Sequence, residues 1–274
     1  MKTDNKILLS LLPYSLEKQK LRMLKNNASY FEIMKEIKFH NIKNIDERIS
    51  SIKEFNTCFA DEKMYPSNLL NCDLPPLRLQ SNGNFPINGR IKFGVIGAAG
   101  ASKKLIKSLQ TFVQSIFKTD SEIVGTGNDA IYKTVEHCEG YNSGRSFIFL
   151  GCGLMRVQYL SRNCSSTLLS PFEPFEDASK RNILSMYEIF GSLCNSVIIF
   201  QCSNNDDIRR SVTPILDSGK GLYVHRDGVS IDKSCEKSFS LYLEGCEMVN
   251  EFDEVVQDEG FIFNPYEKKS KKLD

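Results

Sequence analysis

The sequence predicts an α/β fold with a mostly parallel sheet, preceded by a small helical region. Between residues 91 and 154 a short apolar run is followed three times by a glycine-rich break, at Gly97, at Gly125–Gly127 and at Gly151–Gly153. Amphipathic stretches separate the runs, and such alternation with short connections is typical of parallel sheets with right-handed crossovers. Carboxyl ends of parallel strands share the edge where open α/β sheets bind ligands. Because glycines let backbone approach a phosphate, the breaks predict a phosphate-facing edge.

Residues 1–55 are predicted to form short helices. Leu8–Leu24 and Ser29–Ile37 carry apolar residues at roughly helical spacing. The segment holds 11 Lys and Arg against 7 Asp and Glu. We expect these helices to pack on the neighbouring domain, with binding of DNA or a partner as the alternative.

Prolines shape the next segment. Pro66, Pro75 and Pro76 exclude long helices because proline fixes φ and removes a backbone donor. Leu77–Leu79 is predicted as a short edge strand before the Asn82–Asn84 turn.

The remaining elements follow from apolar runs and glycine breaks. Strands are predicted at 91–96, 122–124, 147–150, 196–200 and, as the last core strand, 221–224. Helices are predicted from Ser102 to about Phe117, from about Ala130 to Cys138, and over 180–193 and 208–217. The acid-rich stretch Leu243–Val256 is expected to close the sheet as a helix or short turn.

Composition excludes several classes of protein. The 274 residues carry a net charge of +1, so the overall charge does not by itself indicate a nucleic-acid partner. The nine cysteines show no CxxC spacing, which favours free thiols in a reducing cytosol and no metal site. No apolar run reaches the roughly 18 residues of a membrane span, and the N-terminus does not resemble a signal peptide. We therefore expect a cytoplasmic, soluble protein without a membrane partner.

Motifs of nucleotide chemistry and catalysis are weak or missing. Gly125–Ala130 matches G-x-G-x-x-A, but a nicotinamide site also needs an acid after the next strand, and none follows Leu150. No Walker A motif is present. Cys152 and His137 have nothing that would orient them as a nucleophile and base. The sequence thus predicts no cofactor, no metal and no catalytic residue.

Several motifs in fixed order resemble those of the DNA-processing protein A family, also called Smf. They are Tyr65-Pro66-x-x-Leu69, Asp73-x-Pro75-Pro76-x-Arg78-Leu79, Gly83-Asn84, the run Leu150-Gly151-Cys152-Gly153-Leu154 through Tyr159, Lys180-Arg181-Asn182-Ile183, and the closing Leu243–Val255. Together they cover about residues 58–256.

The resemblance implies an extended Rossmann-like domain over 58–262, behind a helical domain over 1–57 and before a basic tail over 263–274. It further implies binding of single-stranded DNA, loading of the RecA recombinase during DNA uptake or recombination, formation of a homodimer, and no enzymatic activity.

Two family arginines are replaced: Ala99 and Thr126 stand in their places. The resemblance and the glycine breaks together predict the DNA-binding residues Gly97, Ala98, Ser102, Lys103, Gly125, Thr126, Gly127, Asn128, Gly153, Arg156, Lys180, Arg181 and Asn182. Lys180 and Arg181 are expected to be the main phosphate contacts, with Lys104 as a further compensating cation. The alternatives are a solvated helix face for Lys103 and Lys104 and a structural ion pair for Arg181.

Two other functions stay open. One is a non-enzymatic module of the same fold that binds a nucleotide-derived small ligand, which the near-neutral charge favours. The other is an enzyme that cleaves nucleoside phosphates, although the Gly-Gly-x-Gly-Thr turn of such proteins is not found.

Overall fold

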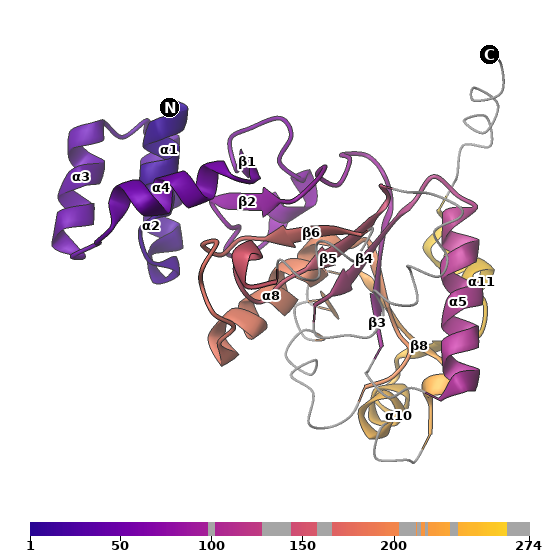
Figure 1. The fold of residues 1–274 in the computed structure, drawn as a ribbon. Coiled ribbons are helices and arrows are strands. Elements are labelled where there is room, and N and C mark those ends of the chain that lie inside the picture. The colour runs from indigo at the N-terminus through magenta and orange to yellow at the C-terminus, as the bar shows by residue number, and fades with distance from the viewer. Residues whose placement is uncertain are drawn as a thin grey trace.

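The computed structural model confirms an α/β fold with a mostly parallel sheet (Figure 1). It describes residues 1–97, 102–127, 144–157, 166–202, 212, 215–216, 219–230 and 235–261. Across these residues a nine-stranded sheet runs in the order β1-β2-β6-β5-β4-β3-β7-β8-β9. The seven strands from β6 to β9 in that order pair in parallel, whereas β1 and β2 pair antiparallel.

The N-terminal segment forms the expected short helices. They are α1 (Thr3–Ser10), α2 (Glu17–Lys25), α3 (Tyr30–Phe39) and α4 (Ile45–Lys53), with the 3-10 turn η1 (Tyr14–Leu16). Pro13 divides the periodic stretch predicted at Leu8–Leu24 into two helices. Ser29 begins α3 with a capping box, in which its hydroxyl accepts from the Glu32 amide and the Glu32 carboxylate accepts from the Ser29 amide.

The first strands differ from the prediction. The segment predicted at Leu77–Leu79 becomes β2 (Arg78–Ser81), but it lies inside the sheet, between the edge strand β1 (Asn56–Phe59) and β6 (Thr167–Ser170). The edge prediction is therefore wrong, because both β1 and β6 were missed. Each strand contains only two consecutive apolar residues, Cys58 and Phe59 in β1 and Leu168 and Leu169 in β6, too few for a recognisable apolar run.

The repeating central part is confirmed. It contains β3 (Lys92–Ile96), α5 (Lys103–Phe117), β4 (Glu122–Thr126), β5 (Ser146–Phe149), η4 (Leu154–Val157), α8 (Lys180–Leu193), β7 (Ser196–Ile199) and β8 (Gly221–His225), after the early 3-10 turn η2 (Ser67–Asn71). The helix predicted from Ala130 to Cys138 lies outside the described residues, as does most of that predicted over 208–217.

The C-terminal part adds one strand beyond the predicted last one. After η5 (Arg226–Gly228) come α10 (Glu236–Leu243), β9 (Glu247–Val249) and α11 (Phe252–Glu259). β9 pairs in parallel with β8 and forms the second edge of the sheet. Its side chains are largely exposed, so its acidic sequence did not resemble a buried strand.

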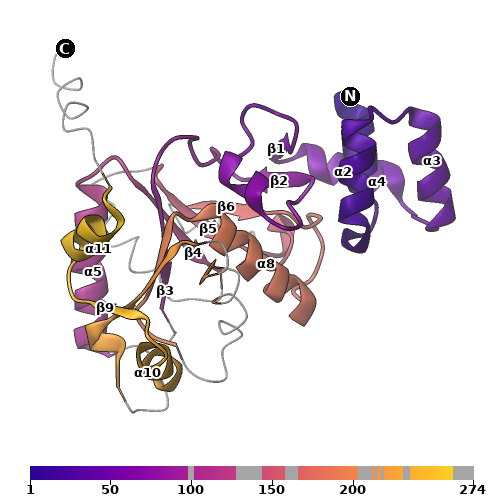
Figure 2. The same ribbon diagram turned by 180° about the vertical axis from the view of Figure 1, so that it is seen from behind.

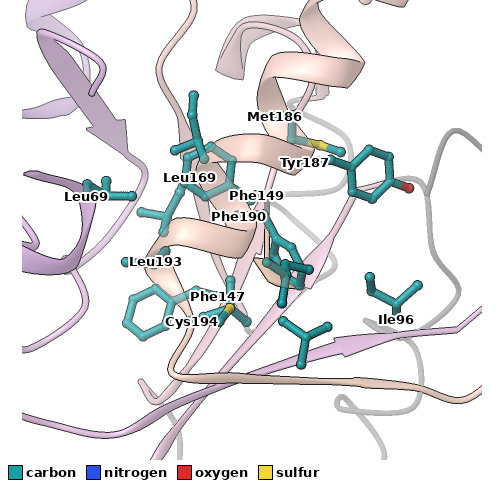
Figure 3. Close-up of a cluster of buried hydrophobic side chains, with 14 of the residues drawn as sticks. Leu69, Ile96, Phe147, Phe149, Leu169, Met186, Tyr187, Phe190, Leu193 and Cys194 are labelled. Carbon is teal, nitrogen blue, oxygen red and sulfur yellow. The ribbon is translucent and has the colours of Figure 1, made fainter. Parts of the chain in front are cut away.

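Two layers of helices sandwich the sheet. Phe93 and Val95 of β3 pack with α5 and α11, whereas Ile96 packs with α8 on the opposite face. This alternation follows the two-residue period of a strand. Figure 3 shows the α8 side, where Tyr187 and Phe190 belong to the same buried cluster as the strand residue Phe149.

The N-terminal helices pack at one end of the molecule, far from α5 and α11 in both views (Figures 1 and 2). Their apolar core includes Phe59 and Leu77 from the region of β1 and β2. Lys6 of α1 forms ion pairs with Asp61 at 2.7 Å and with Glu62 at 2.9 Å. The expected packing of these helices on the neighbouring domain is therefore confirmed.

Candidate nucleic-acid interface

The topology places a candidate site at the carboxyl edge of the sheet. β3 and β7 are neighbours, and from them the chain winds in opposite directions, to β4 on one side and to β8 on the other. Such a switch point opens a crevice outside the carboxyl ends of the strands. Gly97 follows β3 at this point, as the glycine pattern predicts.

Two helices start at this edge, on opposite faces of the sheet. α5 follows β3, and its Ser102 hydroxyl caps the helix by accepting from the Leu105 amide at 3.2 Å. α8 follows β6 and is capped by Ser179, whose hydroxyl accepts from the Asn182 amide at 3.1 Å. The first turn of α8 lies so close to the end of β5 that a Cβ on Gly151 would come within 3.1 Å of the Ile183 side chain.

The charges in these two first turns oppose the helix dipoles. α5 begins with Lys103 and Lys104, α8 begins with Lys180 and Arg181, and neither has an acidic residue in its first turn. A cation near a helix N-terminus loses about 0.3–1 kcal/mol of dipole interaction relative to an anion there. A bound anion would instead meet free N–H groups and a positive dipole end at both helices, with Lys103 at α5 and Lys180 and Arg181 at α8 as the nearby cations.

Three of these cations form no ion pair with a described residue. Lys103, Lys180 and Arg181 are exposed, and in the described part of the chain none of them has a carboxylate within 4.0 Å. The ion-pair alternative for Arg181 thus finds no partner there. Two other candidates are engaged: Lys104 pairs with Asp227 at 2.7 Å, and Arg156 pairs with Asp177 at 2.9 Å.

The segment after β8 fastens the start of α5, and sequence reasoning missed it. Asp227 accepts hydrogen bonds from Lys104 and from Ser108, which hold the pKa of its carboxyl below the usual range. His225 supports Asp227 by accepting from its amide at Nδ1, while its Nε2 donates to the Asn250 carbonyl at 3.0 Å. The Asp227-Gly228 turn was the available signal.

Gly153 and Asn182 have structural roles. A Cβ on Gly153 would come within 1.8 Å of the Glu173 carbonyl oxygen, and the Gly153 amide donates to the Glu176 carbonyl at 2.8 Å. Buried Asn182 donates from its side-chain amide to the Glu176 carboxylate at 2.7 Å. These contacts fix the segment before α8, so both residues position Lys180 and Arg181.

Other predicted residues lie elsewhere than expected. Gly125 and Thr126 belong to β4 rather than to a turn, since they pair with Ile148 and Phe149 of β5. The break begins at Gly127, whose amide donates to the Phe149 carbonyl at 2.9 Å. Thr126 is β-branched, which favours a strand, and it is fully buried. Ala98 and Asn128 lie outside the described residues.

Gly97 differs from Gly153 in its surroundings. A Cβ on Gly97 would meet, among described atoms, only the Phe200 Cβ at 3.8 Å, which is ordinary contact. Packing against the described residues therefore does not require glycine at this position, whereas close approach of a ligand backbone would.

The described residues bear on two other kinds of chemistry, metal binding and nucleophilic attack by Cys152. No group of three or more His, Cys, Asp or Glu side chains there could hold a metal ion. Burial, with a contribution from Asp177, raises the pKa of the Cys152 thiol, which makes it a poor nucleophile. Among the helices described, none is long and apolar enough to span a membrane.

Comparisons with known proteins match this architecture. The family model described as DNA recombination-mediator protein A matches residues 56–259. No curated protein matches the sequence. The solved structure of DNA processing protein A from Streptococcus pneumoniae is 21% identical over 96% of this chain and 100% of its own, with a TM-score of 0.73.

A second solved structure comes from a study of the single-stranded DNA binding mode of DNA processing protein A from Helicobacter pylori. It is 15% identical over 74% of this chain and 95% of its own, with a TM-score of 0.60. At these identities both structures establish the fold, which includes the helical N-terminal region in the first case.

Proposed function

The chain belongs to the DNA recombination-mediator protein A family, and from this premise we propose that the carboxyl edge of its sheet binds single-stranded DNA. The observation that carries the proposal is the pair of basic first turns on α5 and α8, both at the switch-point edge. Phosphate contacts supply most of the sequence-independent affinity for nucleic acid. Lys103, Lys180 and Arg181 are the cations proposed to make them.

The lost arginines set the expected strength of binding. Thr126, in place of one family arginine, is buried in β4 and offers no charge. Ala99 replaces the other. If each lost charge-assisted hydrogen bond contributes about 1.5–3 kcal/mol, the remaining cations must carry a larger share of the affinity. Removing any one of these cations should then lower the affinity for single-stranded DNA measurably.

We propose further that the chain dimerises and delivers bound DNA to the RecA recombinase, without catalysing a reaction itself. Exposed apolar side chains near the β9 edge support a protein contact: Leu243 is 68% exposed, Tyr242 40% and Met248 38%. Light scattering at tens of micromolar tests the dimer, and a mass near 31.1 kDa contradicts it. Acceleration of RecA filament formation on oligo(dT) tests delivery, and unchanged filament kinetics contradict it.

Fluorescence anisotropy of a labelled oligo(dT) of some tens of nucleotides, titrated across a salt series, tests DNA binding. We expect affinity to fall steeply with salt, with a slope of about −0.7 per phosphate contact for a single strand. No binding by micromolar protein at low salt would overturn the proposal. Competition by a mononucleotide at an equal phosphate concentration would favour the small-ligand alternative.

A further inference from the structure

A second cationic feature lies apart from the glycine breaks, between the N-terminal helices and the segment that leads into α8. A cavity of about 240 Å³ opens there. Its lining includes Leu12 and Lys20 from the N-terminal helical region, Arg48 of α4, Arg78 of β2, Glu173 and Arg181. It therefore joins three parts of the fold and shares Arg181 with the proposed DNA edge.

Arg78 is the unusual member of this lining. The residue is only 3% exposed, and its Nη1 donates to the Ser10 hydroxyl at 2.7 Å. Among the residues that the structure describes, its buried Nε has no hydrogen-bond partner and no carboxylate lies within 4.0 Å of its guanidinium. Burial lowers the pKa of Arg78 to about 10, so it is still charged at neutral pH. A buried cation without a paired anion is unfavourable unless a further group satisfies it.

The neighbouring carboxylates are engaged by other groups. Glu17 pairs with Lys20. Glu173 accepts from Arg48, with 2.7 Å between the arginine Nε and Oε2. Glu176 accepts from the Asn182 amide at 2.7 Å and from the Glu173 amide at 3.3 Å. Arg78 and the exposed Arg181 are the lining cations left without an ion pair in the described structure.

We propose that this cavity binds a phosphate group, with buried Arg78 and exposed Arg181 as its two cationic contacts. Arginine presents a planar fork of donors that suits phosphate oxygens. The volume is below the roughly 300–1,000 Å³ typical of pockets for drug-sized ligands. It therefore suits one phosphate group or a mononucleotide better than a dinucleotide.

The phosphate can come from two sources, a free phosphate compound or the backbone of a DNA strand that continues past Arg181. Only the second source rests on the proposed function. Either source places the partner at the junction between the N-terminal helices and the sheet, so occupancy should also stabilise that junction.

The test measures thermal unfolding of the full chain and its binding by calorimetry, with inorganic phosphate and thymidine monophosphate as probes. The variants are Arg78→Met, Arg78→Lys and Arg181→Ala, with Lys118→Ala, at the far end of α5, as the matched control. We expect phosphate to raise the melting temperature of the wild type and the control. We expect Arg78→Met to weaken binding at least tenfold, and Arg181→Ala and Arg78→Lys to weaken it by smaller factors.

Methionine fills most of the arginine volume without its charge, and apolar replacement of buried ions is often neutral for stability. If Arg78→Met fails to fold, exposed Arg181→Ala and charge-retaining Arg78→Lys still decide the matter. Phosphate binding that is unchanged in both overturns the proposal, as does an absence of binding to the wild type.

Oligo(dT) titrations separate this proposal from the DNA proposal. Loss of oligo(dT) affinity in Arg78→Met together with loss of phosphate binding identifies the DNA backbone as the source, whereas loss of phosphate binding alone identifies a free compound. Arg78-dependent phosphate binding without any oligo(dT) binding retains the cavity and rejects the DNA function. Oligo(dT) binding without phosphate binding retains the DNA function and rejects the phosphate cavity.

Discussion

The helices at the carboxyl edge and the helices of the N-terminal region treat charge in opposite ways. Every one of α1 to α4 has an acidic residue in its first turn, whereas α5 and α8 have a basic pair and no acid there. Acids at helix N-termini stabilise a fold and cations destabilise it. The comparison suggests that the N-terminal charges serve folding, as does Lys104 through its ion pair with Asp227, and that Lys103, Lys180 and Arg181 serve a ligand.

The cations of the two regions also differ in their partners. Lys6 and Arg48 join the N-terminal helices to Asp61, Glu62 and Glu173. Lys103, Lys180 and Arg181 have no such partners among the described residues. The same residue types thus have two roles, which the position of nearby carboxylates distinguishes and which composition alone does not.

The largest effect should come from the glycine that anchors the start of α8. In Gly153→Ala the new methyl group would lie 1.8 Å from the Glu173 carbonyl oxygen and 2.3 Å from that of Pro174. The backbone must move to relieve this clash. We expect a loss of about 3 kcal/mol in the free energy of unfolding, measured by urea denaturation. Gly97→Ala, the matched control, should leave stability within about 1 kcal/mol of wild type and weaken oligo(dT) binding. Equal stability of the two variants would contradict the packing argument.

Removing the exposed cations of α8 should separate binding from stability. In Lys180→Ala/Arg181→Ala we expect a roughly 100-fold loss of oligo(dT) affinity, at about 1.4 kcal/mol per contact. The salt slope should fall by about 1.4 because two phosphate contacts are lost. Unfolding should occur at an unchanged or higher urea concentration. Anisotropy that matches the Lys118→Ala control would remove both residues from the site.

The converse change is Lys6→Met in the N-terminal region. Lys6 is buried, and its removal leaves Asp61 and Glu62 without their cation. We expect the free energy of unfolding to fall by about 1–2 kcal/mol, less than for a fully buried pair because both carboxylates are about one-third exposed. DNA affinity should stay at the wild-type value. A drop in DNA affinity would show that the two roles are not separate.

Ser102→Asp gives α5 the charge pattern of the N-terminal helices. Aspartate keeps the N-cap and adds a favourable dipole interaction, so stability should be unchanged or up to about 1 kcal/mol higher. Its negative charge should repel DNA and weaken oligo(dT) binding up to about tenfold. Ser102→Ala should instead lose about 1 kcal/mol of stability. Tighter DNA binding by Ser102→Asp would contradict the proposal that the basic first turn of α5 serves DNA binding.

The smallest effect is a pH dependence at the segment that fastens α5. Burial lowers the pKa of His225, whose ring stacks on Phe200. Between this lowered pKa and the ordinary value near 6.5, the unfolded chain binds a proton that the folded chain does not. The contribution of His225 to the free energy of unfolding should therefore be fully present above about pH 6.5. It should decrease as the pH falls through that window. Urea denaturation of wild type and His225→Gln at several pH values tests this, since the variant should show a shallower decline.

The central strands and helices could be predicted because their signals are local. The apolar run of β3, the Ser102 cap and the amphipathic helix that follows all agree. β1, β6 and β9 could not, because each has only two consecutive apolar residues and is defined by its pairing partners. Pairing also explains why Gly125 and Thr126 continue β4, since β5 extends the ladder beyond the apolar run.

The candidate site was predictable as an edge but not as a set of contacts. Sequence spacing identified the helix starts at Ser102 and Lys180. It did not reveal that Lys104 pairs with Asp227, more than 100 residues away in sequence, or that Asn182 turns inward to Glu176. Such engagement depends on tertiary neighbours, which no local pattern encodes.

The shared core of the helices and the sheet limits how the protein can be divided for experiments. Phe59 and Leu77 are 1% and 0% exposed because the N-terminal helices cover them. A fragment that begins at β1 would present both side chains to water, at about 1.5–3 kcal/mol each. Such a fragment would adsorb nonspecifically to plastic, lipid or other copies of itself. Binding measurements on the sheet region alone would therefore include this nonspecific adsorption, so they should be made with the full 274-residue chain.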